Sequence, residues 1–149
     1  MAVRDDIENL YALYAWAFDM DQLELLADMF TDDAKVEFSD GQAEGREEVL
    51  ADLEKRRAIF RRDSLVPWHL MTNLHIVRAT EREATVRCFY TFFVKQPSGS
   101  IDPNRIGYYE DVFVEQAGVW RIRRRRIVSG GRPTTETAPD EATPGRQTR

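Results

Sequence analysis

The spacing of apolar residues changes near Pro67, and this change constrains the fold more than any other feature of the sequence. Before Pro67, apolar side chains recur at steps of three and four, which is the period of an amphipathic helix. After it, they alternate with polar side chains over several stretches, as in strands that bury one face. Helices followed by a run of strands predict an α+β fold, with the helices on one face of a mainly antiparallel sheet.

The part before Pro67 predicts three helices and one short strand. Asp21 is expected to cap the second helix, because residues 21–24 have the spacing of a capping box. A strand is expected at 34–38, a turn at 39–41 and a charged helix from 45 to about 59. The first helix is predicted from a single apolar stripe, formed by Ile7, Leu10, Tyr11, Tyr14 and Phe18.

The part after Pro67 predicts four strands. Residues 95–103 are expected to form a loop, and Ala117-Gly118 carries the signal of a tight hairpin. The expected strands cover 68–79, 84–94, 105–116 and 119–128.

Composition excludes several classes of protein. The single cysteine, Cys88, cannot form an intrachain disulfide, and no apolar run approaches the roughly 20 residues of a membrane span. The net charge of −5 disfavours a general nucleic-acid binder. Without a signal-peptide pattern at the start, we expect a cytoplasmic protein. Residues 133–149 have no large apolar side chain, so a flexible tail is expected after a domain at 3–132.

The chain has two histidines, His69 and His75. In a regular strand they would lie about 20 Å apart, too far to share a metal ion. They would share a mixed face with Met71 and Asn73, which suits a cavity wall or an interface. The opposite face is the cleaner core face, formed by Leu70, Thr72, Leu74 and Ile76. The alternative at either position is a partly buried, hydrogen-bonded histidine without a catalytic role.

Asp19 is a second candidate, because it falls at the C-terminal end of the first helix, where the helix dipole disfavours a carboxylate. A residue that breaks a local rule is a candidate for function, although a solvated turn residue is the alternative. Tyr14 lies on the apolar stripe and is otherwise a core residue. The two differ by about 140° around an ideal helix, so they share a pocket only if the helix ends or bends near Asp19.

Five arginines make the last strand basic: Arg121 and Arg123–Arg126. Strict alternation places Arg124 and Arg126 on the side of Trp120 and Ile122, where either could reach a pocket. The alternative is a solvated or subunit-facing ladder that pairs with carboxylates of the neighbouring strand, namely Glu110, Asp111 or Glu115.

Several segments together resemble the SnoaL-like and scytalone dehydratase-like group of the nuclear transport factor 2-like superfamily, over about residues 5–130. They are YAWAFD at 14–19, FTDDA at 30–34, GREEV at 45–49, HLMTN at 69–73 and GVWRI at 118–122. The resemblance implies a cone-shaped α+β barrel, with three N-terminal helices packed on a strongly curved sheet around an apolar pocket. It also implies a homotrimer or homodimer, and no metal or organic cofactor.

In bile-acid dehydratase-like and hexachlorocyclohexane dehydrochlorinase-like members, an aspartate that ends the first helix pairs with a histidine on the following long strand. Those positions fall on Asp19 and His69, and a tyrosine of the bile-acid type falls on Tyr14. The resemblance thus implies a lyase or isomerase, a dehydratase or cyclase type of enzyme acting on a small apolar molecule such as a polycyclic or aromatic compound.

Eight further residues are expected to contact the substrate: Phe38, Trp68, Met71, Asn73, Phe89, Phe92, Tyr108 and Arg126. Two alternatives stay open. One is a non-catalytic module that binds a small ligand or takes part in an assembly. The other is an epoxide hydrolase, which needs an arginine between two carboxylates inside the cone.

Overall fold

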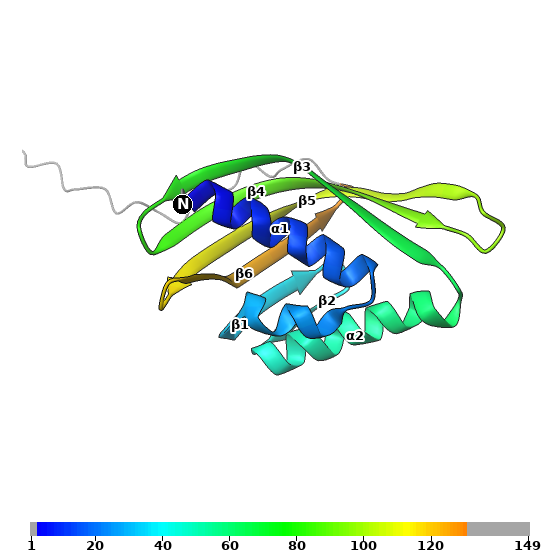
Figure 1. Cartoon of the computed structure of the whole chain (residues 1–149), viewed down its shortest axis with the longest axis horizontal. Coiled ribbons are helices and arrows are strands. Elements are labelled where there is room, and N and C mark those ends of the chain that lie inside the picture. Colours follow the sequence, from blue (N-terminus) through cyan, green and yellow to red (C-terminus); the bar gives the residue numbers. More distant parts are fainter. Residues whose placement is uncertain (1–2, 131–149) are drawn as a thin grey trace, which may run out of the picture.

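The computed structural model describes residues 3–130 and shows helices packed on one face of a sheet (Figure 1). Within these residues the helices are α1 (Val3–Asp19), the 3₁₀ helix η1 (Leu23–Met29) and α2 (Arg46–Arg62). The strands are β1 (Phe30–Phe38), β2 (Gly41–Glu44), β3 (Val66–Ala79), β4 (Glu83–Lys95), β5 (Ile101–Gln116) and β6 (Val119–Ser129). The predicted tail at 133–149, and the last two residues of the predicted domain, lie outside the described residues.

The six strands form one curved sheet in the order β2-β1-β6-β5-β4-β3. Only β1 and β6 are parallel, and the other neighbours are antiparallel. The predicted α+β class with three helices on a mainly antiparallel sheet is therefore confirmed. Since β2 and β3 are edge strands that do not pair with each other, the expected barrel is a curved sheet that stays open.

Two local predictions are wrong, and one strand was not predicted. The second helix is 3₁₀, and Asp21 does not cap it: Gln22 holds the cap position without a side-chain bond. Asp21 instead has a φ of 58° and accepts a hydrogen bond from Arg61 of α2 at 2.5 Å. Residues 41–44 form β2 by pairing with β1, whereas the sequence predicted only a turn at 39–41 before the helix. The loop expected at 95–103 is shorter, because Lys95 and Ile101 already pair across the β4–β5 hairpin.

A bulge in β3 decides which of its side chains face the core. The register with β4 shifts between Thr72 and His75, and Asn73 inside this shift has a φ of 56°. Before the bulge His69 is largely covered and Leu70 is 45% exposed, whereas after it Leu74 packs against the core. A one-residue slip moves every later side chain to the other face. The expected core face is therefore wrong for Leu70 and Thr72, and correct for Leu74 and Ile76.

The same kind of shift occurs in β6. Trp120 and Ile122 are buried, but the next fully buried side chain is Arg125, since the register with β5 shifts between Val112 and Phe113. Arg124 and Arg126 consequently lie outside the core, where they pair with Glu37 and Glu110. Strict alternation had placed these two arginines on the pocket side, and that prediction is wrong.

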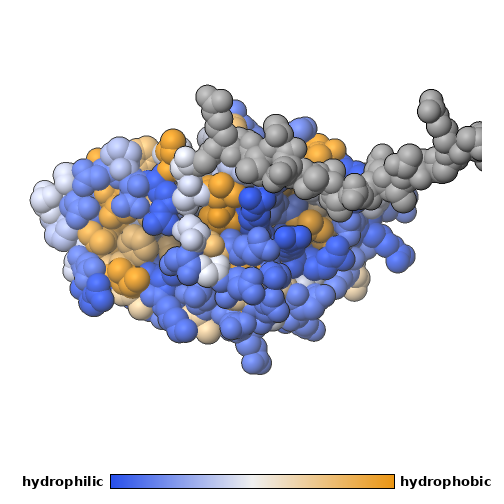
Figure 2. Space-filling view, turned by 180° about the vertical axis from the view of Figure 1, so that it is seen from behind, coloured by the Kyte–Doolittle hydropathy of each residue, from blue (hydrophilic) through white to orange (hydrophobic). Residues whose placement is uncertain are grey.

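The two faces of the sheet differ in character. The inner face and the helices enclose the hydrophobic core. The outer face exposes several large apolar side chains, among them Trp68, Leu70, Phe89 and Ile106. Viewed from behind, the molecule has apolar patches scattered among polar ones (Figure 2). Among residues 3–130, no helix combines the length and the apolar character needed to cross a membrane.

Candidate active site

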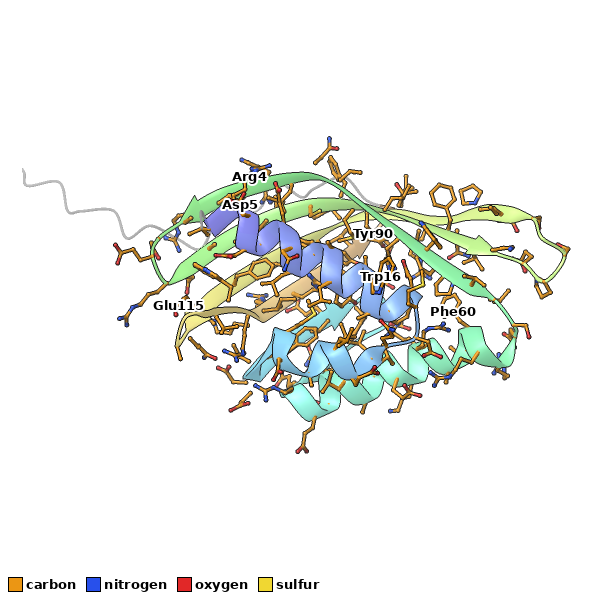
Figure 3. The ribbon with its side chains drawn as sticks, viewed as in Figure 1. Arg4, Asp5, Trp16, Phe60, Tyr90 and Glu115 are labelled. Atoms are coloured by element: carbon orange, nitrogen blue, oxygen red, sulfur yellow. The ribbon has the colours of Figure 1, made fainter. Side chains whose placement is uncertain are left out.

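A cavity of about 340 Å³ lies between α1, α2 and the inner face of the sheet. Its wall is mostly aromatic and aliphatic, and Figure 3 labels Tyr90 on the sheet and Phe60 on α2, two of its members. The apolar and aromatic wall residues are Tyr14, Phe18, Phe38, Leu53, Ile59, Phe60, Tyr90, Phe92, Tyr109 and Ile127. The others are His69, Ser39, Asp40, Arg56, Asn104 and Arg105. An apolar wall with a few polar groups is typical of small-molecule sites.

Asp19 and His69 form a buried pair at this cavity. One Asp19 oxygen, Oδ1, lies 2.6 Å from His69 Nδ1, and the other, Oδ2, accepts the His69 backbone N–H at 2.7 Å. The side chains are 6% and 10% exposed, respectively. Because a carboxylate is an acceptor, it favours the proton on Nδ1 and leaves Nε2 as the unprotonated nitrogen of the neutral ring. Both the orientation and the tautomer of His69 are therefore fixed by one carboxylate.

The end of α1 explains how a carboxylate is tolerated at this position. Arg57 of α2, which is buried, donates from Nε to the Phe18 carbonyl at 2.9 Å and from Nη2 to the Asp19 carbonyl at 3.5 Å. This cation satisfies carbonyls at the helix end and offsets the negative end of the helix dipole. Because α1 includes Asp19, the helix geometry that separates it from Tyr14 still holds: Tyr14 lines the cavity, and Asp19 reaches the site only through its hydrogen bonds to His69.

Tyr14 lines the cavity beside His69, with ring centroids 6.4 Å apart. Burial raises the pKa of Tyr14, and the nearby Arg125 guanidinium partly opposes this rise. Burial also raises the pKa of Tyr109, another wall residue, well above its usual value. Both phenols are therefore protonated hydrogen-bond donors at neutral pH.

A second pair, Asp111 and Arg125, is also buried. The sequence predicted, as an alternative, that the strands of these two residues pair arginines with carboxylates, but in a solvated or subunit-facing ladder and not in the core. Arg125 donates from Nε and Nη2 to the two Asp111 oxygens at 2.9 and 2.7 Å, and Tyr11 donates its hydroxyl to Asp111 Oδ2 at 2.5 Å. The guanidinium carbon lies 4.3 Å from the Tyr14 ring centroid and 4.4 Å from that of Tyr109. A fixed positive charge thus lies directly against two rings of the cavity wall.

Of the eight expected substrate contacts, only Phe38 and Phe92 line the cavity. Trp68 and Phe89 are about half exposed on the outer face, because each is one residue away from an inward-facing position. Tyr108 is buried on that same side, next to Phe89, while its neighbour Tyr109 faces the cavity.

The remaining three expected contacts also lie outside the wall. Met71 packs against the core, Asn73 forms the β3 bulge, and Arg126 pairs with Glu110 at 3.2 Å. Conversely, Tyr90 could have been found, since it is two residues from Phe92 and thus on the same strand face. No comparable signal marks Arg125, whose inward position depends on the bulge.

The exposed side of the cavity is polar. Arg56 donates to Asp40 and to Asp52, at 2.6 Å each, and its guanidinium carbon lies 3.9 Å from the Phe38 ring centroid. The hydrogen bond from Arg56 lowers the pKa of Asp40. Within the described part of the chain, no three His, Cys, Asp or Glu side chains gather as metal ligands would.

Comparisons with known proteins agree with this fold. ActVI-ORFA from Streptomyces coelicolor superposes with a TM-score of 0.77 at 18% identity, covering 86% of this chain and 95% of that one. Aln2 from a Streptomyces species gives 0.74 at 22% identity, with 85% and 90% covered. A protein from Novosphingobium aromaticivorans DSM 12444, proposed to be a scytalone dehydratase, gives 0.72 at 25% identity, with 96% and 95% covered.

A comparison with curated proteins finds no match. The family model of the SnoaL-like domain matches residues 1–126, which is most of the chain. This match confirms the resemblance noted in the sequence. The chain belongs to the SnoaL-like domain family.

Proposed function

We propose that the protein is a general acid/base enzyme of the dehydratase, isomerase or cyclase type, which acts without a cofactor on a small apolar molecule. One observation carries the proposal: both oxygens of a buried carboxylate hold His69 at the wall of a largely apolar cavity. A histidine fixed in one tautomer beside an apolar cavity is suited to proton transfer near neutral pH.

In this mechanism His69 is the general base. Its Nε2 removes a proton from a carbon that is activated by a neighbouring carbonyl or leaving group. Asp19 stabilises the imidazolium that forms, because its carboxylate already accepts a hydrogen bond from Nδ1. A positioned base of this kind contributes roughly 10²- to 10⁴-fold to the rate. The imidazolium then returns the proton to another atom of the substrate or gives it to the leaving group.

Tyr14 donates a hydrogen bond to the oxygen on which negative charge develops, either an enolate or a departing hydroxide. Its raised pKa keeps it protonated at neutral pH. The Arg125 cation, 4.3 Å from the Tyr14 ring, favours negative charge on that side of the cavity. Charge stabilisation and proton abstraction are thereby assigned to different residues.

The relatives support this class of chemistry without identifying the reaction. The protein from Novosphingobium aromaticivorans, proposed to be a scytalone dehydratase, is matched over nearly its whole length. The epoxide hydrolase alternative loses ground for two reasons. In residues 3–130 the fully buried arginine, Arg125, bonds one carboxylate. Arg56, which bonds both Asp40 and Asp52, does so at the exposed side of the cavity. The non-catalytic alternative is an outcome of the following test.

Proton abstraction is tested directly by deuterium exchange. The protein is incubated in D₂O with a panel of cyclic ketones that includes 2-tetralone, and loss of the proton next to the carbonyl is followed by NMR. We expect exchange above the buffer rate, reduced roughly 10²- to 10⁴-fold in His69→Gln. His75→Gln is the matched control, since this exposed histidine lies outside the cavity.

An unchanged rate in a folded His69→Gln variant would remove His69 from the mechanism. Exchange at the buffer rate with every ketone, despite measurable binding, would support a non-catalytic binding module. The homotrimer or homodimer stays a prediction, and light scattering after gel filtration measures it.

A further inference from the structure

We propose that Tyr90, supported by Ser129, forms an oxygen-recognition subsite in the cavity, so that the substrate has a neutral acceptor oxygen away from its reacting carbon. This inference rests on the cavity being the substrate site, as in the proposed function. It specifies the chemical class further: a fused-ring compound with a carbonyl or ether oxygen.

The subsite is built from one row of residues across three strands. Tyr90 of β4 pairs with Gly107 of β5, which pairs with Ser129 of β6. The Tyr90 hydroxyl reaches across β5 to Ser129 Oγ, at 2.7 Å. Tyr90 lines the cavity and its ring stacks on that of Tyr109, with centroids 4.9 Å apart.

Gly107 is what makes this reach possible. A Cβ atom at this position would lie 2.0 Å from the Val128 backbone oxygen and 2.9 Å from both Cε1 and the hydroxyl of Tyr90, so both β6 and the Tyr90 side chain exclude it. With glycine, the Tyr90 ring lies flat over β5 instead of projecting into the cavity. The side chain therefore forms part of the wall, and its hydroxyl is held in a fixed position by Ser129.

The hydroxyl hydrogens of Tyr90 and Ser129 show that one hydrogen-bond donor stays free. Two hydroxyls have two hydrogens, and the bond between them uses one. Among the described residues, neither hydroxyl has another side-chain partner. Tyr90 lines the cavity and Ser129 does not, so the productive arrangement has Ser129 donating to Tyr90. The Tyr90 hydroxyl then donates into the cavity, and its donor strength is increased by the bond it accepts.

The position of Tyr90 relative to His69 sets the size of the ligand. His69 pairs with Phe92 across β3 and β4, and Tyr90 is two residues farther along β4. Two residues of strand span about 7 Å along the backbone. The Tyr90 hydroxyl lies farther from His69 than this, because it reaches across β5 to Ser129. A fused-ring molecule can thus present one carbon to His69 while an oxygen on a distant ring reaches Tyr90. The Tyr90 hydroxyl is an uncharged group with one hydrogen to donate, which suits a neutral acceptor oxygen.

A matched pair of probes tests the subsite by binding alone. We would titrate 1-tetralone and tetralin, which share a bicyclic skeleton and differ in one carbonyl, into the wild type and into variants, and follow NMR shifts. Tyr90→Phe should weaken 1-tetralone binding roughly 3- to 10-fold, the effect of one net hydrogen bond. Tetralin affinity should stay within about twofold, because the ring is retained. Ser129→Ala should give a smaller loss for the ketone only.

Tyr108→Phe is the control, since this hydroxyl lies on the outer side of the sheet and has no partner in the described structure. The infrared carbonyl stretch of bound 1-tetralone gives an independent readout, and its hydrogen-bonding shift should disappear in Tyr90→Phe. Equal losses for both probes would overturn the proposal, because the ring and not the hydroxyl would then matter. A ketone effect confined to Tyr14→Phe would also overturn it. Absence of deuterium exchange together with an intact Tyr90 effect would instead refute only the acid/base chemistry.

Discussion

Among residues 3–130, two carboxylates are buried on the inner side of the sheet, and their partners give them different roles. Asp19 holds His69, a titratable base that lines the cavity. Asp111 holds Arg125, a permanent cation that is 1% exposed and sealed beneath aromatic rings. Only the first pair can exchange a proton with a bound molecule. The partner of a buried carboxylate, and its access to the cavity, therefore decide whether the carboxylate serves chemistry or structure.

The two pairs also differ in how they depend on their partners. A guanidinium cannot lose its proton in a protein, so Arg125 without Asp111 would be an uncompensated buried charge. Imidazole can remain neutral, so His69 without Asp19 loses its orientation but avoids an isolated charge. We therefore expect the loss of Asp111 to affect mainly folding and the loss of Asp19 to affect mainly catalysis.

The largest expected effect is that of Asp111→Asn. Breaking one partner of a buried ion pair costs about 3–5 kcal/mol in the free energy of unfolding. Urea denaturation measures this, with Glu110→Gln as the control. Glu110 pairs with two partly exposed arginines, Arg87 and Arg126, so the control should lose only about 1 kcal/mol. Similar losses in the two variants would contradict the division proposed above.

Asp19→Asn comes next and should act mainly on the rate. An amide can donate to Nδ1 and so favour the wrong tautomer, which predicts a roughly 10²- to 10⁴-fold slower deuterium exchange. The unfolding free energy should fall by only about 1–3 kcal/mol, because the amide oxygen can still accept the His69 backbone N–H. Full activity in this variant would show that the carboxylate does not orient the base.

The same comparison shows what could be predicted from sequence. Asp19 was singled out because it breaks a local rule at a helix end, and His69 because it lies on a mixed strand face. The family resemblance then paired them, and neither position lies beyond a bulge. Arg125 was missed because it follows a register shift inside a run of four arginines, where alternation selects Arg124 and Arg126 instead. The face of the sheet on which a strand residue lies can be predicted by alternation only as far as the first bulge of that strand.

The helices α1 and α2, and the stretches of strand between register shifts, were predictable for the same reason, since each has an uninterrupted period. Bulges depend on how neighbouring strands fit together, which a single strand does not encode. Asn73 gave a weak signal, because asparagine tolerates a positive φ better than most residues. The curvature of the sheet and the Tyr90–Ser129 contact depend on three strands at once, and no local pattern contains them.

Tyr11 and Tyr14 of α1 offer a third test of the different roles of the Asp19–His69 and Asp111–Arg125 pairs. Tyr11 donates to Asp111, and a hydrogen bond to a charged group contributes about 1.5–3 kcal/mol, so Tyr11→Phe should destabilise the fold by that amount. Tyr14 faces the cavity, so Tyr14→Phe should reduce the exchange rate with a smaller change in the unfolding free energy. Urea denaturation and the exchange assay on both variants measure this, and the reverse pattern would assign Tyr11 to the chemistry.

The smallest expected effect is on the unfolding free energy at alkaline pH. It reports on the buried tyrosines around Asp111 and Arg125 and not on this ion pair itself. Burial raises the pKa of Tyr11, Tyr14 and Tyr109 above the value near 10 of the unfolded chain. The stability that these groups contribute is therefore fully present below about pH 10 and is lost as the pH rises toward the folded-state pKa values, because the unfolded state releases protons first. Each tyrosine should add a slope of about 1.4 kcal/mol per pH unit in that window. Urea denaturation between pH 9 and 11 gives the fall of the unfolding free energy per pH unit, and this fall should be smaller in Tyr14→Phe by the contribution of one tyrosine. An unchanged fall would mean that Tyr14 ionises as freely in the folded protein as in the unfolded chain.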